Sequence, residues 1–328
     1  MEEVACILCS KPGLPWLQKA DKFPPHERFR VVRCPACGLA WVSPRPGPQD
    51  IGRYYPDTYS WRPESQGAEP AVHRLERWYR FHLLRYETRQ LLASTDLGPG
   101  DAVLDVGCSS GDRMLVLKQA GLAPWGVEVS PAADFARDRL GLDVRRGTLE
   151  EARFDDGRFR AATLHNVLEH VHDPRRLLGE ARRVLAPGGW LVVQSPSAAS
   201  LQACLFGRRW AAVDVPRDLY YYTPALLARL LESAGFEVAA VVHRTSFLHP
   251  PTAAVSLAPW ADPQRFWNAE AEGNALGAAA QRVGWAAVTV AVMPAVWLES
   301  VSWRSAIPTT FARRGSAAKP VDYERSGP

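Results

Sequence analysis

The chain has 328 residues, which is long enough for about two domains and a sizeable buried core. Hydrophobic residues make up 47% and charged residues 23% of it, which excludes a wholly disordered or fibrous protein. The 39 basic and 35 acidic residues leave a formal net charge of +4, too small an excess to predict a nucleic-acid partner.

The sequence predicts neither a signal peptide nor a membrane span. MEEVACIL has no basic flank before an apolar run, so we expect no signal peptide and a cytoplasmic protein. The longest uncharged stretch that could pass for a membrane span, 283–298, is shorter than the ~20 residues that a crossing helix needs, and Pro294 interrupts it. We therefore expect no transmembrane segment.

Four cysteines near the amino end form two C-x2-C pairs, Cys6 with Cys9 and Cys34 with Cys37. Each pair can place two thiolates on a tight turn, which Gly38 suits, and two such turns complete a tetrahedral zinc site. The alternatives are four buried free thiols or redox chemistry. Paired spacing twice over in a short segment without a core favours structural zinc. Four thiolates close the metal to water, so it would hold residues 1–48 together and take no part in catalysis.

After an aromatic linker at 49–68 and a helical segment at about 70–93, β-rich runs alternate with helical ones. The expected strands are 102–106, 124–129, 161–167, 190–195 and 238–243. The expected helices between the strands include 112–120, 131–140 and 174–185. Strands that alternate with helices predict parallel pairing and a doubly wound, Rossmann-like α/β sheet.

A glycine-containing turn follows the first of these strands directly. The strand AVLDV leads into Gly107-Cys-Ser-Ser-Gly111 and then a helix, an arrangement typical of nucleotide-type ligand sites. A dinucleotide fold would need G-x-G-x-x-G, but Ser109 replaces the middle glycine and no third glycine is in register. Asp105 just before the turn also disfavours a pyrophosphate, whereas Glu128 on the next strand suits ribose hydroxyls in either case.

The motifs VLDVGCSSG, GVEVS, NVLEHVHDPRRLLGEARRVLAPGGWLVV and TPALLARLLESAGF, in this order, resemble class I S-adenosylmethionine-dependent methyltransferases. With the cysteine quartet they resemble the branch that has an amino-terminal zinc-binding lobe, which includes sugar C-methyltransferases and natural-product methyltransferases. The resemblance covers roughly residues 5–245. It implies a seven-stranded sheet whose last strand pair is antiparallel.

The resemblance also implies where S-adenosylmethionine binds. Glu128 would hold the ribose, residues 148–150 would border the adenine, and Asn166 would lie near the methionine part. The implied cofactor-binding residues are Asp105, Gly107, Ser109, Gly111, Glu128, Thr148, Leu149, Asn166 and Tyr59.

His170 is the candidate general base, because an imidazole titrates near neutral pH and this one follows the fourth strand of the core. Adjacent Glu169 could orient it. One alternative is that the motif E-H-V-x-D-P only orders its loop. Another is the metal-binding E-x-x-E-H segment of quinone-pathway O-methyltransferases, but Asn166 stands in place of its first acid, which leaves two ligands.

Aromatic residues in two segments are candidate walls of an acceptor pocket. One group is Tyr54, Tyr55 and Tyr59 in the linker, and the other lies in RRWAAVDVPRDLYYYTP, where Asp218 replaces a histidine that relatives often have. Ordinary packing is the alternative for each aromatic side chain. The candidate substrate-binding residues are Tyr55, Trp210, Arg217 and Tyr222.

The region from 246 to 304 is an Ala- and Trp-rich insertion that we expect to form a helical cap packed on the sheet. A dimer interface and a membrane-surface contact are the alternatives; the latter is disfavoured because only Arg282 and Arg304 could supply a basic face. The expected segments are a zinc-binding lobe at 1–48, a linker or flap and helix at 49–98, the S-adenosylmethionine-binding core at 99–245, the insertion at 246–304, a last strand at 305–314 and a flexible tail at 315–328.

These features favour a methyltransferase that uses S-adenosylmethionine on a small-molecule acceptor such as a sugar, sugar-nucleotide or secondary metabolite. The alternatives are a zinc-lobed binding or assembly protein that keeps the fold without turnover, and a quinone-type O-methyltransferase.

Overall fold

The computed structural model describes residues 1–55, 71–243, 249–263, 265–266 and 273–315. Contacts between residues divide the chain into two compact units, each built from segments that lie far apart in the sequence. The first unit consists of Met1–Gly47, Pro196–Pro224 and His243–Pro308. The second consists of Pro48–Ser195, Ala225–Val242 and Thr309–Pro328.

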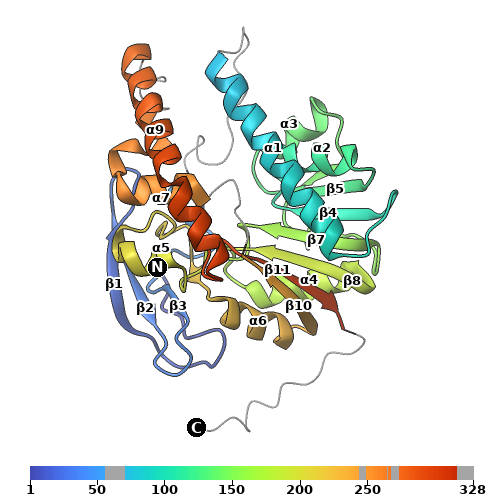
Figure 1. Cartoon of the computed structure of the whole chain (residues 1–328). Coiled ribbons are helices and arrows are strands. Elements are labelled where there is room, and N and C mark those ends of the chain that lie inside the picture. The colour runs from blue at the N-terminus through green and yellow to red at the C-terminus, as the bar shows by residue number, and fades with distance from the viewer. Residues whose placement is uncertain (56–70, 244–248, 264, 267–272, 316–328) are drawn as a thin grey trace. The chain divides into compact units, whose positions relative to one another are not determined.

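The second unit is built on a seven-stranded sheet, as the sequence predicts (Figure 1). In spatial order its strands are β10 (Phe236–Val242), β11 (Thr309–Arg314), β8 (Leu185–Gln194), β7 (Phe159–His165), β4 (Ala102–Val106), β5 (Ala123–Glu128) and β6 (Val144–Arg146). The five strands from β8 to β6 pair in parallel, whereas β11 is antiparallel to both of its neighbours. The expected Rossmann-like sheet with an antiparallel last pair is therefore confirmed.

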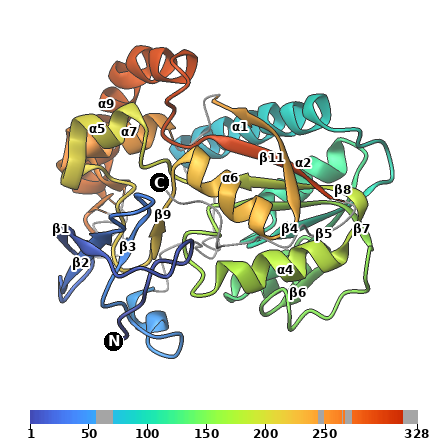
Figure 2. The ribbon, with the colours of Figure 1, turned by 90° about the horizontal axis from the view of Figure 1, so that it is seen from below.

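Helices cover both faces of this sheet (Figures 1 and 2). One face carries α1 (Ala71–Ser94), α2 (Asp112–Gln119) and α3 (Ala132–Asp138), and the other carries α4 (Pro174–Val184) and α6 (Pro224–Ser233). Leucines of α1 and α2 pack on Val103, Ala161 and Phe311 of the sheet to form a dry core. A short helix, η1 (Ile51–Tyr54), precedes α1.

The order of the strands predicts where on this sheet a ligand binds. The chain runs outward from β4 to β5 and β6, and it then returns to β7 on the other side of β4. In doubly wound sheets, ligands bind beyond the carboxyl ends of the strands where the strand order reverses. Here that point is the pair β4 and β7.

The first unit has an antiparallel sheet of its own. Its strands, in spatial order, are β1 (Leu14–Ala20), β2 (Arg28–Arg33), β3 (Ala40–Val42) and β9 (Tyr220–Tyr221). The last strand comes from a segment almost 180 residues further along the chain, so the small amino-terminal sheet is completed by the 196–224 segment. Buried Phe29, Val31 and Trp41 form the core beneath it.

The remaining elements of the first unit are helical. They are α5 (Leu201–Phe206), η2 (Gly207–Arg209), α7 (His249–Leu257), η3 (Pro259–Ala261) and α9 (Ala275–Val301). The insertion is thus helical, as expected. The expected interruption at Pro294 is wrong, because α9 continues through this proline, is 27 residues long and contains the uncharged stretch 283–298. By length and composition, its segment Leu276–Val301 could cross a membrane.

Two predictions fall on residues that the structure does not describe. Tyr59 and the rest of 56–70 lie outside the described residues, and so does the expected tail from 316 onward. For both, the sequence-based expectation stays a prediction.

Candidate functional site

The glycine turn lies at the carboxyl end of β4, where the strand order reverses. Gly107, Ser109 and Gly111 all have left-handed backbones, with φ of +74°, +48° and +85°. The amides of Gly107 and Cys108 both donate to the carbonyl of Val127 on β5, at 2.8 and 3.2 Å. Glycine adopts such angles without strain, and serine does so at a cost, so the turn keeps this shape with Ser109 at its middle position.

Two acidic side chains flank this turn. The carboxylate of Glu128 accepts hydrogen bonds from the amides of Ser109 and Ser130, at 2.9 and 2.8 Å. Asp105 is only 3% exposed and accepts a hydrogen bond from the Thr163 hydroxyl at 2.7 Å. Burial raises the pKa of Asp105, and the charge of Glu128 acts in the same direction. Removing such carboxylates from water favours a cationic ligand nearby.

The other predicted cofactor residues lie beyond the ends of β6 and β7. Thr148 and Leu149 follow β6, where the Thr148 amide donates to Glu151 Oε2 at 2.8 Å and Leu149 is buried. Asn166 follows β7 with φ of +53°, and its buried Oδ1 has no hydrogen-bond partner among the described residues. An orphaned buried acceptor at this edge suits a bound group that supplies a donor, such as an amine.

His170 and Glu169 lie in a tight turn after β7. The amide of His170 donates to the carbonyl of Val167 at 3.0 Å, and Asp173 then caps the amino end of α4 through the amide of Arg176. Tyr55 packs edge-on against the His170 ring, with 6.3 Å between ring centroids. The structure therefore brings together two separately predicted residues, Tyr55 and His170, from segments more than a hundred residues apart.

The two side chains of this turn differ in environment. Glu169 is 2% exposed, and burial raises its pKa, although the nearby charge of His170 opposes this shift. His170 is partly exposed. A partly exposed imidazole beside a buried carboxyl group can accept a proton from a bound acceptor, and the carboxyl group can balance the positive charge of the imidazolium.

A buried polar cluster beside this turn was not predicted. Glu87 of α1 forms an ion pair with Arg113 of α2 at 3.0 Å, and Gln194 of β8 donates weakly to both Glu87 and Thr309, at 3.5 and 3.3 Å. His165 at the end of β7 lies near this cluster, and burial holds its pKa well below the usual range, so it is neutral. The signal in the sequence that could have pointed to this cluster is that two apolar strands end on polar residues, β7 on His165 and β8 on Gln194.

The remaining predicted substrate residues lie in the first unit. Trp210 and Tyr222 are buried, Tyr222 stacks on Tyr220, and the carbonyl of Trp210 accepts a hydrogen bond from Lys19 Nζ at 2.9 Å. Burial lowers the pKa of Lys19 to about 8. The structure thus shows these two aromatic side chains in packing roles, and their contact with an acceptor stays a prediction.

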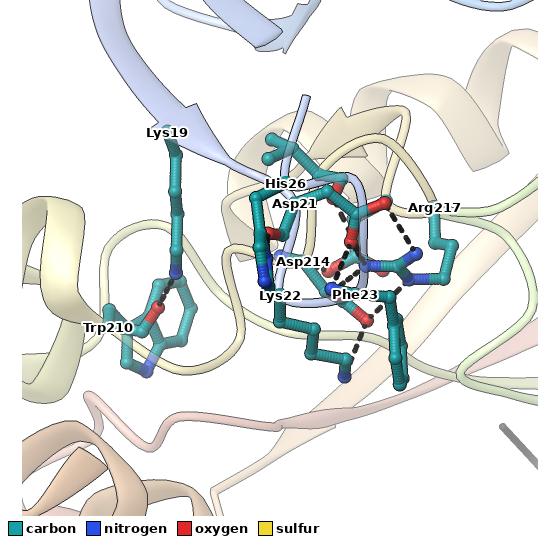
Figure 3. Close-up of polar contacts among 10 residues, drawn as sticks. Lys19, Asp21, Lys22, Phe23, His26, Trp210, Asp214 and Arg217 are labelled. Carbon is teal, nitrogen blue, oxygen red and sulfur yellow. Dashed lines mark hydrogen bonds and ion pairs between the residues drawn. The ribbon is translucent and has the colours of Figure 1, made fainter. Parts of the chain in front are cut away.

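Arg217 is fully buried in an ion-pair cluster, shown in Figure 3. Its guanidinium donates to Asp21 at 2.5 Å and to Asp214 at 2.7 Å, and it packs over the ring of Phe23. Burial alone would raise the pKa of Asp214, but Lys22 and Arg217 outweigh it and hold that pKa below its usual range. This guanidinium is therefore engaged in joining two loops of the first unit, which leaves acceptor binding by Arg217 a prediction.

Asp218, which stands where relatives often have histidine, belongs to the same loop. Its carboxylate accepts a hydrogen bond from the amide of Asp214 at 3.2 Å, and its own amide donates to the carbonyl of Asp214 at 2.8 Å. The acidic side chain thus helps to shape the loop that holds Arg217.

The four amino-terminal cysteines converge as predicted. Their sulfur atoms all lie within 4.8 Å of one another, with separations of 3.3 Å for Cys9–Cys34 and 3.5 Å for Cys6–Cys37. Tetrahedral Zn–S bonds of about 2.3 Å place sulfur atoms roughly 3.8 Å apart, so the cluster fits zinc. Gly38 has φ of +82° in the second knuckle, a left-handed backbone that favours glycine.

Comparison with known proteins agrees with this architecture. Residues 76–241, half of the chain, match a family described as a methyltransferase domain, and the chain belongs to this family. Its fold is that of class I methyltransferases, as the sequence resemblance predicts.

Individual relatives match only part of the chain. An uncharacterized 37.1 kDa protein of transposon TN4556 in Streptomyces fradiae is 33% identical over 50% of this chain and 51% of its own length. A ubiquinone biosynthesis O-methyltransferase of Thiobacillus denitrificans is 30% identical over 42% of this chain and 65% of its own length. The chain thus spans about half to two thirds of the curated relatives it matches.

The fold also matches a solved structure. A chain from the complex between the Haloferax volcanii Trm112 methyltransferase activator and a methyltransferase is 17% identical, with a TM-score of 0.50. The match covers 73% of this chain and 94% of that one. At this identity the similarity shows the fold alone.

Proposed function

We propose that this chain transfers a methyl group from S-adenosylmethionine to a hydroxyl group or an acidic carbon of a small-molecule acceptor. The observation that carries the proposal is the shared position of the Gly107–Gly111 turn and the Glu169–His170 turn, which follow the adjacent strands β4 and β7. A donor held by the first turn would meet an acceptor held by the second at the same edge of the sheet.

The residues at this edge fit the donor. When bound, S-adenosylmethionine supplies an electrophilic methyl group on a sulfonium. Asp105 and Glu128 give the site negative charge, the orphaned Asn166 Oδ1 suits an amine, and a Cβ atom at Gly107 would come within 2.6 Å of Val167. Glu128 would bind the ribose hydroxyls, as such acids do in nucleotide folds.

His170 is the proposed general base. Methyl transfer to a neutral hydroxyl or carbon acid requires a proton to leave, and an imidazole accepts it near neutral pH. Tyr55 fixes the ring from one side, and Glu169 would balance the charge that develops on it. Tyr55 and Glu169 would therefore keep the imidazole in position to accept the proton from the acceptor.

The class of acceptor follows from two different similarities. The zinc-lobed methyltransferases that the sequence resembles favour a sugar, a sugar-nucleotide or a secondary metabolite. The relatives named for ubiquinone biosynthesis and as a demethylmenaquinone methyltransferase favour a phenolic or quinone ring instead. We propose the sugar-type acceptor first and keep the quinone-type acceptor as the second candidate.

The test is transfer of labelled methyl groups from S-adenosylmethionine to a nucleotide-linked ketosugar and, in parallel, to an alkylated catechol. His170→Ala should abolish transfer and leave cofactor affinity within about threefold, because the base does not hold the donor. The control is His82→Ala on α1, an exposed histidine stacked on Trp78. Transfer that survives His170→Ala would remove the base assignment, and cofactor binding with no transfer to any cell-extract acceptor would favour a binding or assembly protein.

A further inference from the structure

The longest helix of the first unit, α9, exposes an apolar face to solvent. Every exposed position between Leu276 and Val301 is Ala, Val, Leu, Met, Pro or Trp. Leu276, Val283, Val290 and Trp297 are each between 62% and 87% exposed. Soluble helices normally show the reverse, with polar residues outward.

The polar residues of α9 lie on its inner face instead. Arg282 is 8% exposed and lies over the ring of Phe266, 4.9 Å from its centroid. Glu299 is 3% exposed and accepts hydrogen bonds from the amide and the side chain of Gln202, at 3.1 and 2.7 Å. The two charges of this segment are therefore neutralised or packed inside the protein, and the outer face has no charge.

The helix is held along its length by the rest of the first unit. Near its amino end, Gly284 packs so closely on Trp260 that a Cβ atom would come within 2.7 Å of that ring. Near its carboxyl end, the Glu299–Gln202 contact holds it to α5. These points are 15 residues apart, or about 22 Å along the axis. A helix attached over this span lies along a surface and does not cross a membrane alone.

The exposed apolar positions occupy about 200° of the helix circumference at 100° per residue. A seam between two helices uses a narrower stripe, and the charged positions beside that stripe set partner and register. No exposed charge lies between Leu276 and Val301, and Trp297 and Trp303 are exposed at the carboxyl end. Tryptophan is favoured at the boundary between lipid tails and headgroups.

We propose that the exposed face of α9 attaches this chain to the surface of a lipid bilayer, with the helix lying in the plane of the interface. This surface is independent of the proposed methyl transfer. Because the outer face has no charge, attachment depends on burial of apolar area and not on anionic headgroups. The sparse basic flank that disfavoured membrane contact in the sequence is therefore no obstacle.

The test is flotation of the full chain with neutral phosphatidylcholine vesicles, at low salt and at about 0.5 M salt, where surface charges are screened. The chain should float with the vesicles equally in both. Val283→Lys combined with Val290→Lys should lower the partition coefficient by about a hundredfold, roughly tenfold for each lost apolar contact. The control is Leu14→Lys combined with Trp16→Lys, which adds the same charge at exposed apolar positions of β1 and should float like the unmodified chain.

Three results would overturn the proposal. The chain could stay at the bottom of the gradient as a monomer. It could stay there as a dimer that the α9 lysines dissociate in analytical ultracentrifugation, which would assign the face to a second copy. The β1 lysines could abolish flotation as strongly as the α9 lysines, which would make the loss nonspecific.

Discussion

Gly111 is the last residue of the cofactor turn. Comparing Gly111→Ala with Gly100→Ala separates the cost of a left-handed backbone, which both variants have, from the cost of a steric clash, which only Gly111→Ala has. Both glycines have φ of +85°, so an alanine at either position takes a left-handed backbone at a cost of about 1–2 kcal/mol. Alanine also lowers the conformational entropy of the unfolded chain, which offsets about 0.4–1 kcal/mol of this cost. Gly100 has no atom within 4 Å of a new Cβ, so Gly100→Ala should cost about 1 kcal/mol.

Gly111 lacks that space. A Cβ atom there would lie 2.5 Å from Leu142 Cδ1 and 3.3 Å from Ala136 Cβ, both of which are buried. Overpacking of this kind adds about 1–3 kcal/mol, so Gly111→Ala should cost about 2–4 kcal/mol in total.

Urea unfolding followed by circular dichroism measures both variants, and calorimetry with S-adenosylmethionine measures their affinity. Gly111→Ala should weaken binding about tenfold or more, because the turn must shift to admit the methyl group, whereas Gly100→Ala should bind normally. Equal losses of stability in the two variants would refute the close contact. Normal affinity in a destabilised Gly111→Ala variant would refute its place in the cofactor site.

Three further predictions concern the rest of the molecule. Arg217→Met should lower the free energy of unfolding by about 3–5 kcal/mol at pH 7, against less than about 1 kcal/mol for the half-exposed Lys22→Met. The larger loss should shrink as pH falls below about 4, because the Asp214 carboxylate then protonates in the variant and in the unfolded chain, whereas Arg217 holds its pKa lower in the unmodified fold; equal losses at pH 7 would contradict the burial argument. Cys34→Ser should release zinc and expose the amino-terminal sheet to protease; unchanged metal content by mass spectrometry would contradict it. Because the pKa of Glu169 is raised in the fold, ionisation of Glu169 lowers the stability of the protein as pH rises above about 4.5. At pH 8, Glu169→Gln should therefore be more stable than the unmodified chain and should transfer methyl groups more slowly. A variant that is less stable at pH 8 would show that the charge of Glu169 is compensated in the fold.

The strands of the core were predictable because their pattern is local. The predicted strand at 102–106 matches β4 without a shift, and the predicted helices 112–120 and 174–185 each end one residue beyond α2 and α4. Errors fall at the ends of elements, as at the predicted helix 131–140, which the structure shortens to α3 (Ala132–Asp138). The predicted strand 161–167 ends at His165, because Asn166 takes a left-handed φ of +53° that turns the chain toward His170.

The partners of the amino-terminal lobe could not be predicted, because they depend on contacts between distant segments. The cysteine spacing predicts its metal cluster, but the lobe borrows β9 from residues 220–221 and pairs Asp21 with Arg217. Arg217 has the same sequence signature whether it binds an acceptor or a buried carboxylate. Only the tertiary structure distinguishes these roles.

The length of α9 was also not evident from the sequence. Arg282 and Glu299 interrupt the apolar run in a linear reading, which limits the uncharged stretch to 283–298. In the fold both charges lie on the inner face, so the apolar surface is longer than the uncharged stretch. The side on which a charge lies depends on tertiary packing, which a hydropathy count does not include.

Calorimetry of the purified chain with S-adenosylmethionine, with its demethylated product and with NAD as the control tests the central claim most directly. We expect one molecule of either sulfur compound to bind per chain, no binding of NAD, and at least tenfold weaker binding of the sulfur compounds after Glu128→Ala. Uptake of neither sulfur compound by the folded chain would contradict the assignment of the Gly107–Gly111 turn and the function proposed from it.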